Sequence, residues 1–190
     1  VLAAARIGHQ VEIYTPDAGL AGFWLVAAKT GTLFLERGKR RDTARVNDAV
    51  TDALNNGDCV AVFPEGTTTD GTGLKPFLPS LLQAAINAES DLQPVALRYV
   101  NLDGSIDTSP AYFGDMSMAQ SLGNILSRRA IHAELLFLEP ISCTGKTRRE
   151  LARQAESAIS SALSLASPHK HLKHLPVLQP QRSVEIARHR

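Results

Sequence analysis

An uninterrupted apolar run, Cys59–Phe63, is the feature that most constrains how this chain can fold. A strand with water on one face alternates apolar and polar residues, whereas a strand covered on both faces is apolar throughout. The run therefore predicts a central strand in a sheet that carries helices on both sides. It ends at Pro64 and Glu65, so the sequence places a carboxylate at the carboxyl end of a buried strand.

Strand and helix patterns alternate on both sides of this run. Two β-prone runs, Val11–Ile13 and Gly31–Leu35, precede it, and apolar residues spaced three and four apart predict a helix that starts at Asp42 and stops before Gly57. Further along we expect helices at 79–88 and 117–127, strands at 93–99 and 131–138, and a last helix after Thr147. This order predicts the α/β class, as a single domain with a mostly parallel central sheet flanked by helices.

The apolar faces of two helices carry specific expectations. Thr147 and Glu150 form a capping-box pattern ahead of the last helix, whose apolar residues are expected to pack on the core. The apolar residues of the helix at 117–127 are expected in the core too, although this face could instead enter a membrane interface or shape an acyl pocket. They are Met118, Leu122, Ile125 and Leu126.

Composition and charge exclude several classes of protein. A net charge of +1 over 190 residues argues against a nonspecific nucleic-acid binder, and no run approaches the roughly 20 apolar residues that span a bilayer. Cys59 and Cys143 lack metal-ligand spacing and are expected to be reduced.

The proline at position 168 separates two expected regions, a domain at residues 1–167 and a basic, mobile tail at 168–190. The tail histidines His169, His171 and His174 could bind a metal, but a polar tail explains them more simply. Its basic residues could rest on anionic lipid, and a solvated terminus fits them equally well.

The segment after the apolar run has the composition of a ligand-binding loop. Ligands of open α/β sheets collect at the carboxyl ends of strands, where loops and helix starts offer backbone N–H groups. Glu65 could orient a substrate hydroxyl or organise cationic groups, Gly66 permits close approach, and Thr67 can donate hydrogen bonds. An ordinary strand exit, with Glu65 facing water, fits the composition equally well.

A second candidate element lies upstream, at Gly31–Arg41. A short strand there delivers Arg37 at its end, followed by Gly38 and three further cationic residues. A planar guanidinium at that position suits bidentate binding of phosphate. Taken alone, the stretch is more simply a solvated basic turn before a helix.

Together the two elements resemble the glycerophospholipid acyltransferase family of 1-acylglycerol-3-phosphate acyltransferases. That family carries a Gly-x-x-Phe-(Ile/Leu)-x-Arg block and then a Phe-Pro-Glu-Gly-Thr block. The first is matched by Gly31, Phe34, Leu35 and Arg37, and the second by Phe63, Pro64, Glu65, Gly66 and Thr67. The resemblance covers about residues 1–165 and implies a glycerol-3-phosphate acyltransferase-like fold. It also implies that Arg37, Glu65, Gly66 and Thr67 bind the phosphate and glycerol of the acceptor.

The resemblance further implies a lipid-modifying reaction at a membrane. A fatty acyl group would pass from acyl carrier protein or coenzyme A to the free hydroxyl of 1-acyl-sn-glycerol-3-phosphate, giving phosphatidic acid for phospholipid biosynthesis. The implied partners are the acceptor lipid, the acyl thioester and the cytoplasmic face of the inner membrane. Nucleic acid, a metal and a separate cofactor are not implied.

The general base of the family has no match in this chain. In the family, an Asn-His pair with an Asp five positions after the His removes the proton of the acceptor hydroxyl. His9 has Tyr14 at the fifth position and is expected to be structural, as is His132. We therefore expect the catalytic His and Asp upstream of Val1, so that residues 1–190 alone would be inactive.

One alternative acceptor and two other functions stay open. The segment Glu65–Gly71, followed by Pro76 and Phe77, also resembles relatives that acylate lyso-ornithine lipids. A noncatalytic lipid-binding remnant fits the missing His-Asp pair. A nucleotide-binding α/β protein fits the Gly- and Thr-rich loop, but neither a Gly-Lys-Ser/Thr nor a Gly-x-Gly-x-x-Gly motif is present in the sequence.

Overall fold

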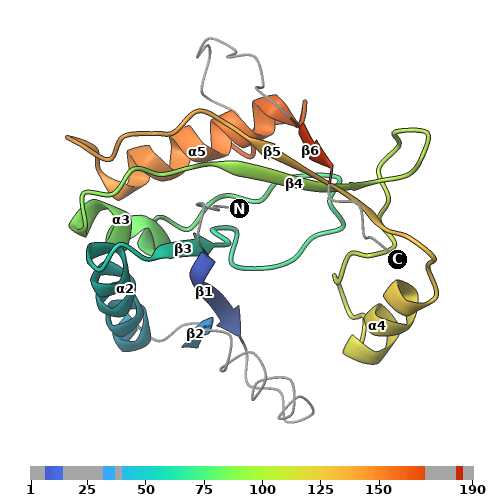
Figure 1. Ribbon diagram of the computed structural model, residues 1–190, viewed down its shortest axis with the longest axis horizontal. Helices are drawn as coiled ribbons and strands as arrows, with labels where there is room; N and C mark the ends of the chain where they lie inside the picture. The colour runs from blue at the N-terminus through green and yellow to red at the C-terminus, as the bar shows by residue number, and fades with distance from the viewer. Residues whose placement is uncertain (1–6, 15–31, 37–39, 170–182, 186–190) are drawn as a thin grey trace.

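The computed structural model describes residues 7–14, 32–36, 40–169 and 183–185, and its strands form two three-stranded sheets (Figure 1). The first sheet is parallel, in the order β2-β1-β3, and contains β1 (Ile7–Tyr14), β2 (Thr32–Glu36) and β3 (Cys59–Val62). The second sheet is antiparallel, in the order β4-β5-β6, and contains β4 (Val95–Val100), β5 (His132–Phe137) and β6 (Ser183–Glu185).

The mixed α/β class is confirmed, but one mostly parallel central sheet is not what the described strands form. The strand predicted at 93–99 pairs antiparallel with β5, with Val95 opposite Phe137 and Val100 opposite His132. The connection from β4 to β5 leaves and returns at the same end of β4, so β5 has to run back along it. The expected central strand, β3, is an edge strand of the parallel sheet among the described residues.

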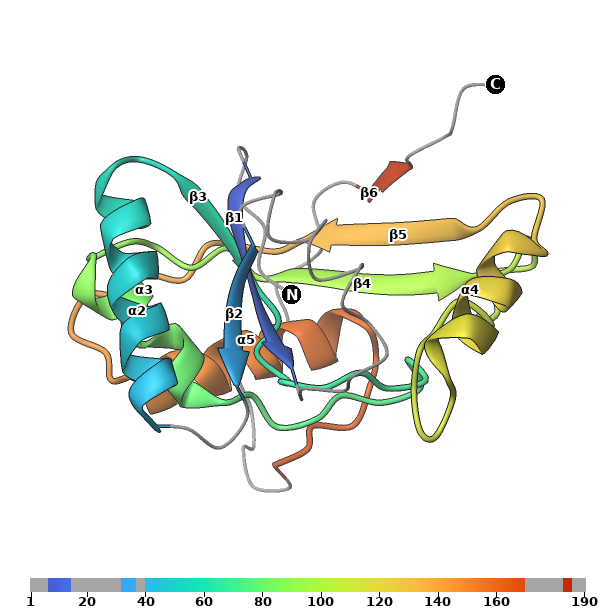
Figure 2. The ribbon, with the colours of Figure 1, turned by 90° about the horizontal axis from the view of Figure 1, so that it is seen from below.

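Five described helical segments accompany the sheets, and four of them contribute to one hydrophobic core. They are α2 (Arg40–Asn55), the 3-10 helix η1 (Pro79–Leu82), α3 (Gln83–Asn87), α4 (Met118–Leu126) and α5 (Arg148–Ala162). The core cluster draws buried residues from α2, β3, η1, β4 and α5, including Val50, Val62, Leu82, Ala96 and Leu151. Figure 2 shows α2, α3 and α5 together on the side of the molecule opposite α4.

Local signals in the sequence predict most helix ends well. The capping box of α5 is confirmed, because Thr147 Oγ1 accepts the N–H of Glu150 at 3.3 Å and Glu150 Oε2 accepts the N–H of Thr147 at 2.8 Å. Gly57, just past α2, has φ of +84°, the left-handed conformation that ends helices. The start of α2 is at Arg40 rather than Asp42, so Asp42 lies inside the helix.

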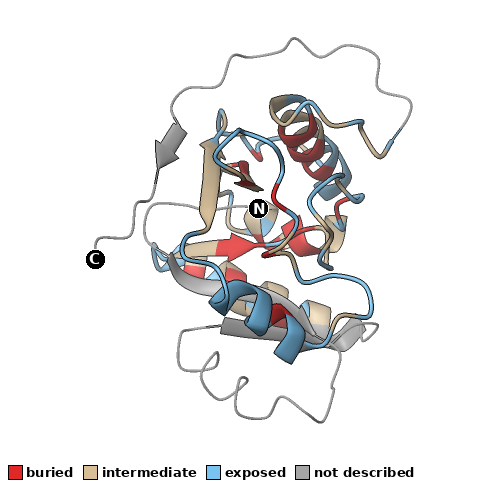
Figure 3. Cartoon of the chain, turned by 90° about the vertical axis from the view of Figure 1, so that its right-hand side faces the viewer, coloured by how far each residue is buried: buried red, intermediate tan, exposed pale blue. Residues whose placement is uncertain are grey.

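The prediction that α4 joins the core is wrong for its described side chains. Leu122, Ile125 and Leu126 are 52%, 37% and 73% exposed, and the buried residue of α4 is Ser121; the side chain of Met118 lies outside the described residues. Most of α4 is coloured as exposed in Figure 3. The helix lies beyond the ends of β4 and β5, away from α2 and α3 (Figures 1 and 2).

Two further features concern membrane spanning and the predicted tail. Within the described residues, no helix has both the length and the apolar character needed to cross a bilayer. The short strand β6 falls inside the segment 168–190 and pairs with β5. Cys59 and Cys143 are free cysteines.

Candidate functional site

The segment Phe63–Leu78, which follows β3, forms a long loop that we call the Glu65 loop. Its base is closed by the N–H of Leu78, which donates to the C=O of Pro64 at 2.7 Å, and Pro64 itself is fully buried. Gly66 takes a positive φ of +63°, a conformation that favours glycine, and its N–H donates to the C=O of Phe63 at 3.1 Å. The Pro-Glu-Gly sequence thus makes a tight turn out of the strand.

Glu65 is half-buried at the base of this loop. Its Oε2 accepts the N–H of Lys75 at 2.9 Å, a contact that spans the loop. Burial raises the pKa of Glu65 above its ordinary value, and repulsion from Glu156 adds to the rise, while the Lys75 N–H and ammonium lower it. Glu65 is therefore bound to the backbone of its own loop, and its role in binding a ligand stays a prediction.

The hydroxyl-rich part of the loop makes its own turn. Asp70 Oδ1 accepts the N–H of Thr72 at 2.9 Å and its hydroxyl at 2.7 Å, and these bonds lower the pKa of Asp70. Thr67 and Thr68 lie before this turn and are exposed. The Asp-Gly end of the Thr-Thr-Thr-Asp-Gly stretch therefore shapes the loop, whereas the first two threonines present hydroxyls on its surface.

The far end of the Glu65 loop is held by α5. Glu156 is 2% exposed, and its Oε2 accepts the N–H of Phe77 at 3.0 Å. The same oxygen lies 3.5 Å from Nε2 of His169. Glu156 is not among the residues predicted for the site, although its position beside Ala155 on the apolar face of the helix is a signal in the sequence. An acid within a buried stripe needs a hydrogen-bond partner.

The structure gives only part of the upstream block. Phe34 lies in β2, in register with Glu12 of β1, while Gly31 and Arg37 lie outside the described residues. Because β2 and β3 both run parallel to β1, Glu36 and Val62 end at the same edge of the sheet. A shared site for Arg37 and Glu65 stays a prediction.

The described histidines do not build a second site. His9 lies in β1 opposite Val60, and His132 begins β5 opposite Val100. His169 faces Glu156, while His171 and His174 lie outside the described residues. Among the residues that the structure describes, no group of His, Cys, Asp and Glu could hold a metal ion.

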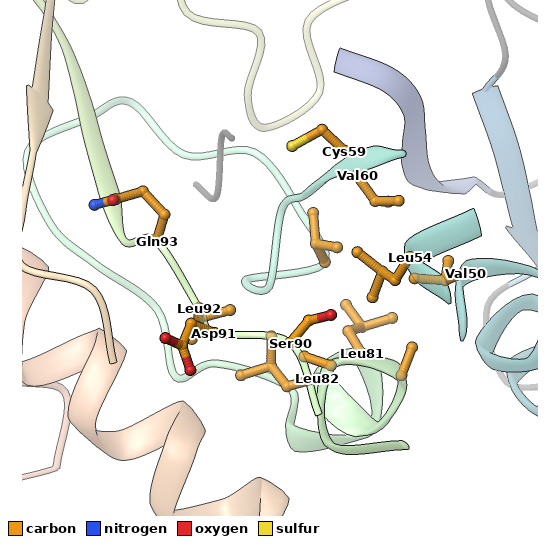
Figure 4. Close-up of a pocket in the computed structure, with 13 residues that line it drawn as sticks. Val50, Leu54, Cys59, Val60, Leu81, Leu82, Ser90, Asp91, Leu92 and Gln93 are labelled. Carbon is orange, nitrogen blue, oxygen red and sulfur yellow. The ribbon is translucent and has the colours of Figure 1, made fainter. Parts of the chain in front are cut away.

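A small apolar pocket of about 70 Å³ lies among α2, β3, η1 and the segment 90–93 (Figure 4). Ligand sites usually enclose about 300–1,000 Å³, so this pocket is too small for a fatty acyl chain. Its lining includes Cys59 and Val60 at the amino end of β3, whereas Glu65 follows the carboxyl end. We assign it no ligand.

Comparison with known proteins places the loop in a family context. Residues 18–98 match the sequence profile of the family described as Acyltransferase, a range that contains both the Arg37 block and the Glu65 loop. The chain belongs to the acyltransferase family. This acyltransferase chain is 42% identical over 146 residues to the lyso-ornithine lipid O-acyltransferase of Pseudomonas aeruginosa. The aligned region covers 76% of this chain and 54% of the relative.

Two further relatives carry the two acceptor names. A lyso-ornithine lipid O-acyltransferase of Brucella abortus is 33% identical over 76% of this chain and 59% of its own. A 1-acyl-sn-glycerol-3-phosphate acyltransferase of Neisseria gonorrhoeae is 36% identical over 60% of this chain and 46% of its own. The chain thus spans about half the length of the curated relatives it matches. No solved structure matches it significantly.

Proposed function

We propose that this acyltransferase moves a fatty acyl group from an acyl thioester to the free hydroxyl of a lyso-ornithine lipid, and that the Glu65 loop binds this acceptor. The observation that carries the proposal is the 42% identity to the Pseudomonas aeruginosa lyso-ornithine lipid O-acyltransferase over 76% of the chain. The segment Glu65–Gly71, followed by Pro76 and Phe77, supports the proposal, because Asp70 shapes the turn of the loop and Phe77 anchors its end.

In the proposed reaction, the hydroxyl oxygen attacks the thioester carbonyl, a C–O bond forms and the C–S bond breaks. The hydroxyl proton passes to a general base, because a neutral hydroxyl is a weak nucleophile. The thiol of coenzyme A or acyl carrier protein leaves. Within residues 1–190 no His has an Asp at the fifth following position. We therefore assign the base to none of the histidines in residues 1–190.

Binding of the acceptor headgroup is assigned to the Arg37 block and the Glu65 loop together. Arg37 is proposed to bind the free carboxylate of the ornithine headgroup through its guanidinium. Glu65, Gly66 and Thr67 are proposed to orient the acceptor next to the sheet edge. Phe63 and Pro64, at the exit of β3, and Gly31 and Phe34, of the upstream block, are proposed to complete the binding site. The half-buried Glu65 supports this role because desolvated carboxylates with shifted pKa values concentrate at functional sites.

A bilayer surface is the proposed second partner, on the cytoplasmic side of the inner membrane. Among the described residues, seven of the ten exposed large hydrophobic side chains lie between Leu102 and Leu126. Such clustering differs from the scattered exposed hydrophobic residues of ordinary surfaces. Tyr112 and Phe113 belong to the cluster, and aromatic side chains favour the boundary between lipid and water.

The second candidate acceptor is 1-acyl-sn-glycerol-3-phosphate, with phosphatidic acid as the product. It is favoured by the Neisseria gonorrhoeae relative, which is 36% identical over 119 residues. In this case Arg37 would bind a phosphate instead of a carboxylate. The difference between the two candidates lies in the headgroup, so binding of the acceptor distinguishes them without any turnover.

The test is to measure binding of both lysolipids to residues 1–190 in nanodiscs, with lysophosphatidylcholine as the control lipid. We expect the tightest binding for lyso-ornithine lipid, and weaker binding in Arg37→Ala. Tighter binding of 1-acyl-sn-glycerol-3-phosphate would select the second candidate, and equal binding of all three lipids would refute an acceptor site. Acyl transfer by residues 1–190 alone, lost in His9→Ala, would overturn the assignment of the base.

A further inference from the structure

We propose that Glu156 is a positioning residue, which holds the Glu65 loop in its binding shape from the last helix, α5. The statement that the loop binds an acceptor rests on the proposed function. The positioning itself rests on contacts between described residues, and it can be tested without any lipid.

Two carboxylates hold one short segment of the loop. Glu65 accepts the N–H of Lys75 at 2.9 Å, and Glu156 accepts the N–H of Phe77 at 3.0 Å. Pro76, between them, has no N–H. Every backbone donor of this three-residue segment is therefore bound to a carboxylate, one from the loop itself and one from α5.

The burial of Glu156 indicates that this contact is the reason for an acid at this position. Its neighbours on the buried face of α5 include Ala152, Ala155 and Ile159, all 3% exposed or less, so the surroundings suit an apolar side chain. A well-packed apolar residue is often at least as stabilising as a buried charge. It would, however, leave the Phe77 N–H without an acceptor, and an unsatisfied buried donor is costly. Glu156 thus stabilises the loop across 79 positions of sequence.

The rigid segment transmits the position of Glu156 to Glu65. The ring of Pro76 fixes φ at that residue, so a shift of the backbone at Phe77 displaces the Lys75 N–H that Glu65 binds. The two carboxylates also repel, and this repulsion contributes to the raised pKa of Glu65. The titratable groups that face the pair in the described structure are Lys75, beside Glu65, and His169, beside Glu156.

Two substitutions separate the hydrogen bond from the charge. Glu156→Ala removes the acceptor, whereas Glu156→Gln keeps an oxygen for the Phe77 N–H and removes the negative charge. Glu150→Ala is a matched control, because Glu150 is on the same helix and also accepts a backbone N–H, that of Thr147, at 2.8 Å, outside the loop. Amide hydrogen exchange at Lys75 and Phe77 measures how firmly the loop is held. The Kd for lyso-ornithine lipid in nanodiscs measures whether that position matters for acceptor binding.

In Glu156→Ala we expect both amides to exchange at least about 10-fold faster, and acceptor binding to weaken about 10-fold, as the loss of one charge-assisted hydrogen bond implies. Glu156→Gln should retain protection and binding, and Glu150→Ala should leave both amides unchanged. Unchanged exchange at Lys75 in Glu156→Ala would overturn the proposal.

If Glu156→Ala does not fold, Glu156→Asp decides the matter, because its shorter side chain withdraws the carboxylate from the Phe77 N–H while keeping the charge. Faster exchange at Lys75 and Phe77 is expected in Glu156→Asp, and wild-type exchange at both amides would overturn the proposal. A wild-type chain that binds no lysolipid would refute the proposed function, whereas the exchange results would still decide the role of Glu156.

Discussion

Replacing Glu65 with glutamine is expected to stabilise the fold at neutral pH while weakening binding of the acceptor. The carboxyl group is half-buried, and desolvation raises its pKa, so its ionised form is held at a free-energy cost in the folded chain. Glutamine offers an oxygen at the same place for the Lys75 N–H and carries no charge to desolvate. A gain in stability with a loss of binding is the pattern of a functional residue.

The variant Glu65→Ala measures how much the hydrogen bond to Lys75 contributes to stability. It removes the acceptor of the 2.9 Å hydrogen bond from Lys75, and one such bond contributes about 1 kcal/mol net. For a chain of this size that difference corresponds to about 2–4 °C in Tm. We therefore expect Glu65→Ala to melt about 2–4 °C below Glu65→Gln, and both variants to bind lyso-ornithine lipid more weakly than the wild type.

The pH dependence gives the decisive comparison. A carboxyl whose pKa is raised in the folded state binds its proton more tightly there than in the unfolded chain, so its contribution to stability increases as the pH falls through that pKa. The advantage of Glu65→Gln over the wild type should therefore shrink from pH 7 toward about pH 5. Thermal melts followed by circular dichroism measure it. A gap that stays constant over this range, or a less stable Glu65→Gln at pH 7, would refute the reasoning.

Three smaller changes test other parts of the molecule. Leu126→Glu should reduce co-sedimentation with anionic phospholipid vesicles, whereas Phe137→Glu, at an exposed position of β5, should not; equal losses would count against α4. Arg128→Ala should lower the Tm, because the guanidinium binds both oxygens of Asp107 at 2.9 and 3.0 Å. Ser109→Ala should move acid unfolding to higher pH. Hydrogen bonds from Ser109 are the main cause of the lowered pKa of Asp107, and the stability that a lowered pKa provides is lost as the pH falls through that pKa.

Features fixed by neighbours in sequence could be predicted from the sequence. The capping box at Thr147 and Glu150 and the left-handed Gly57 need only a few adjacent residues, and both are present as expected. The helix at 79–88 is found as η1 followed by α3. A strand just before Glu65 follows equally from the run Cys59–Phe63, although only Ala61 and Val62 of β3 are buried and Phe63 is exposed.

Features that depend on distant partners could not be predicted in this way. The helical spacing of Leu122, Ile125 and Leu126 indicates one apolar face but does not say whether another element covers it, and none of these three side chains is buried. The direction of β5 depends on the path of the connection from β4, which the apolar pattern does not record. The place of Glu156 on the apolar face of α5 predicts a buried hydrogen bond but not its partner, the N–H of Phe77, which lies 79 residues away.

The direction of the Glu65 loop bears on how an acyltransferase of this kind would reach its acceptor. A lysolipid that stays in the bilayer presents its headgroup and hydroxyl at the surface, so the loop and the membrane-facing part of the protein have to meet the same plane. The loop runs from β3 toward the end of the molecule that carries α4, and both views of the ribbon agree on this (Figures 1 and 2). The exposed apolar face of α4 would therefore bring the Glu65 loop toward the bilayer, whereas the buried end of the loop, at Phe77, stays anchored in the core. On this argument, Leu126→Glu should weaken the binding of lysolipid presented in vesicles but leave the binding of a monomeric, short-chain lysolipid unchanged. The second measurement requires the loop but not the membrane.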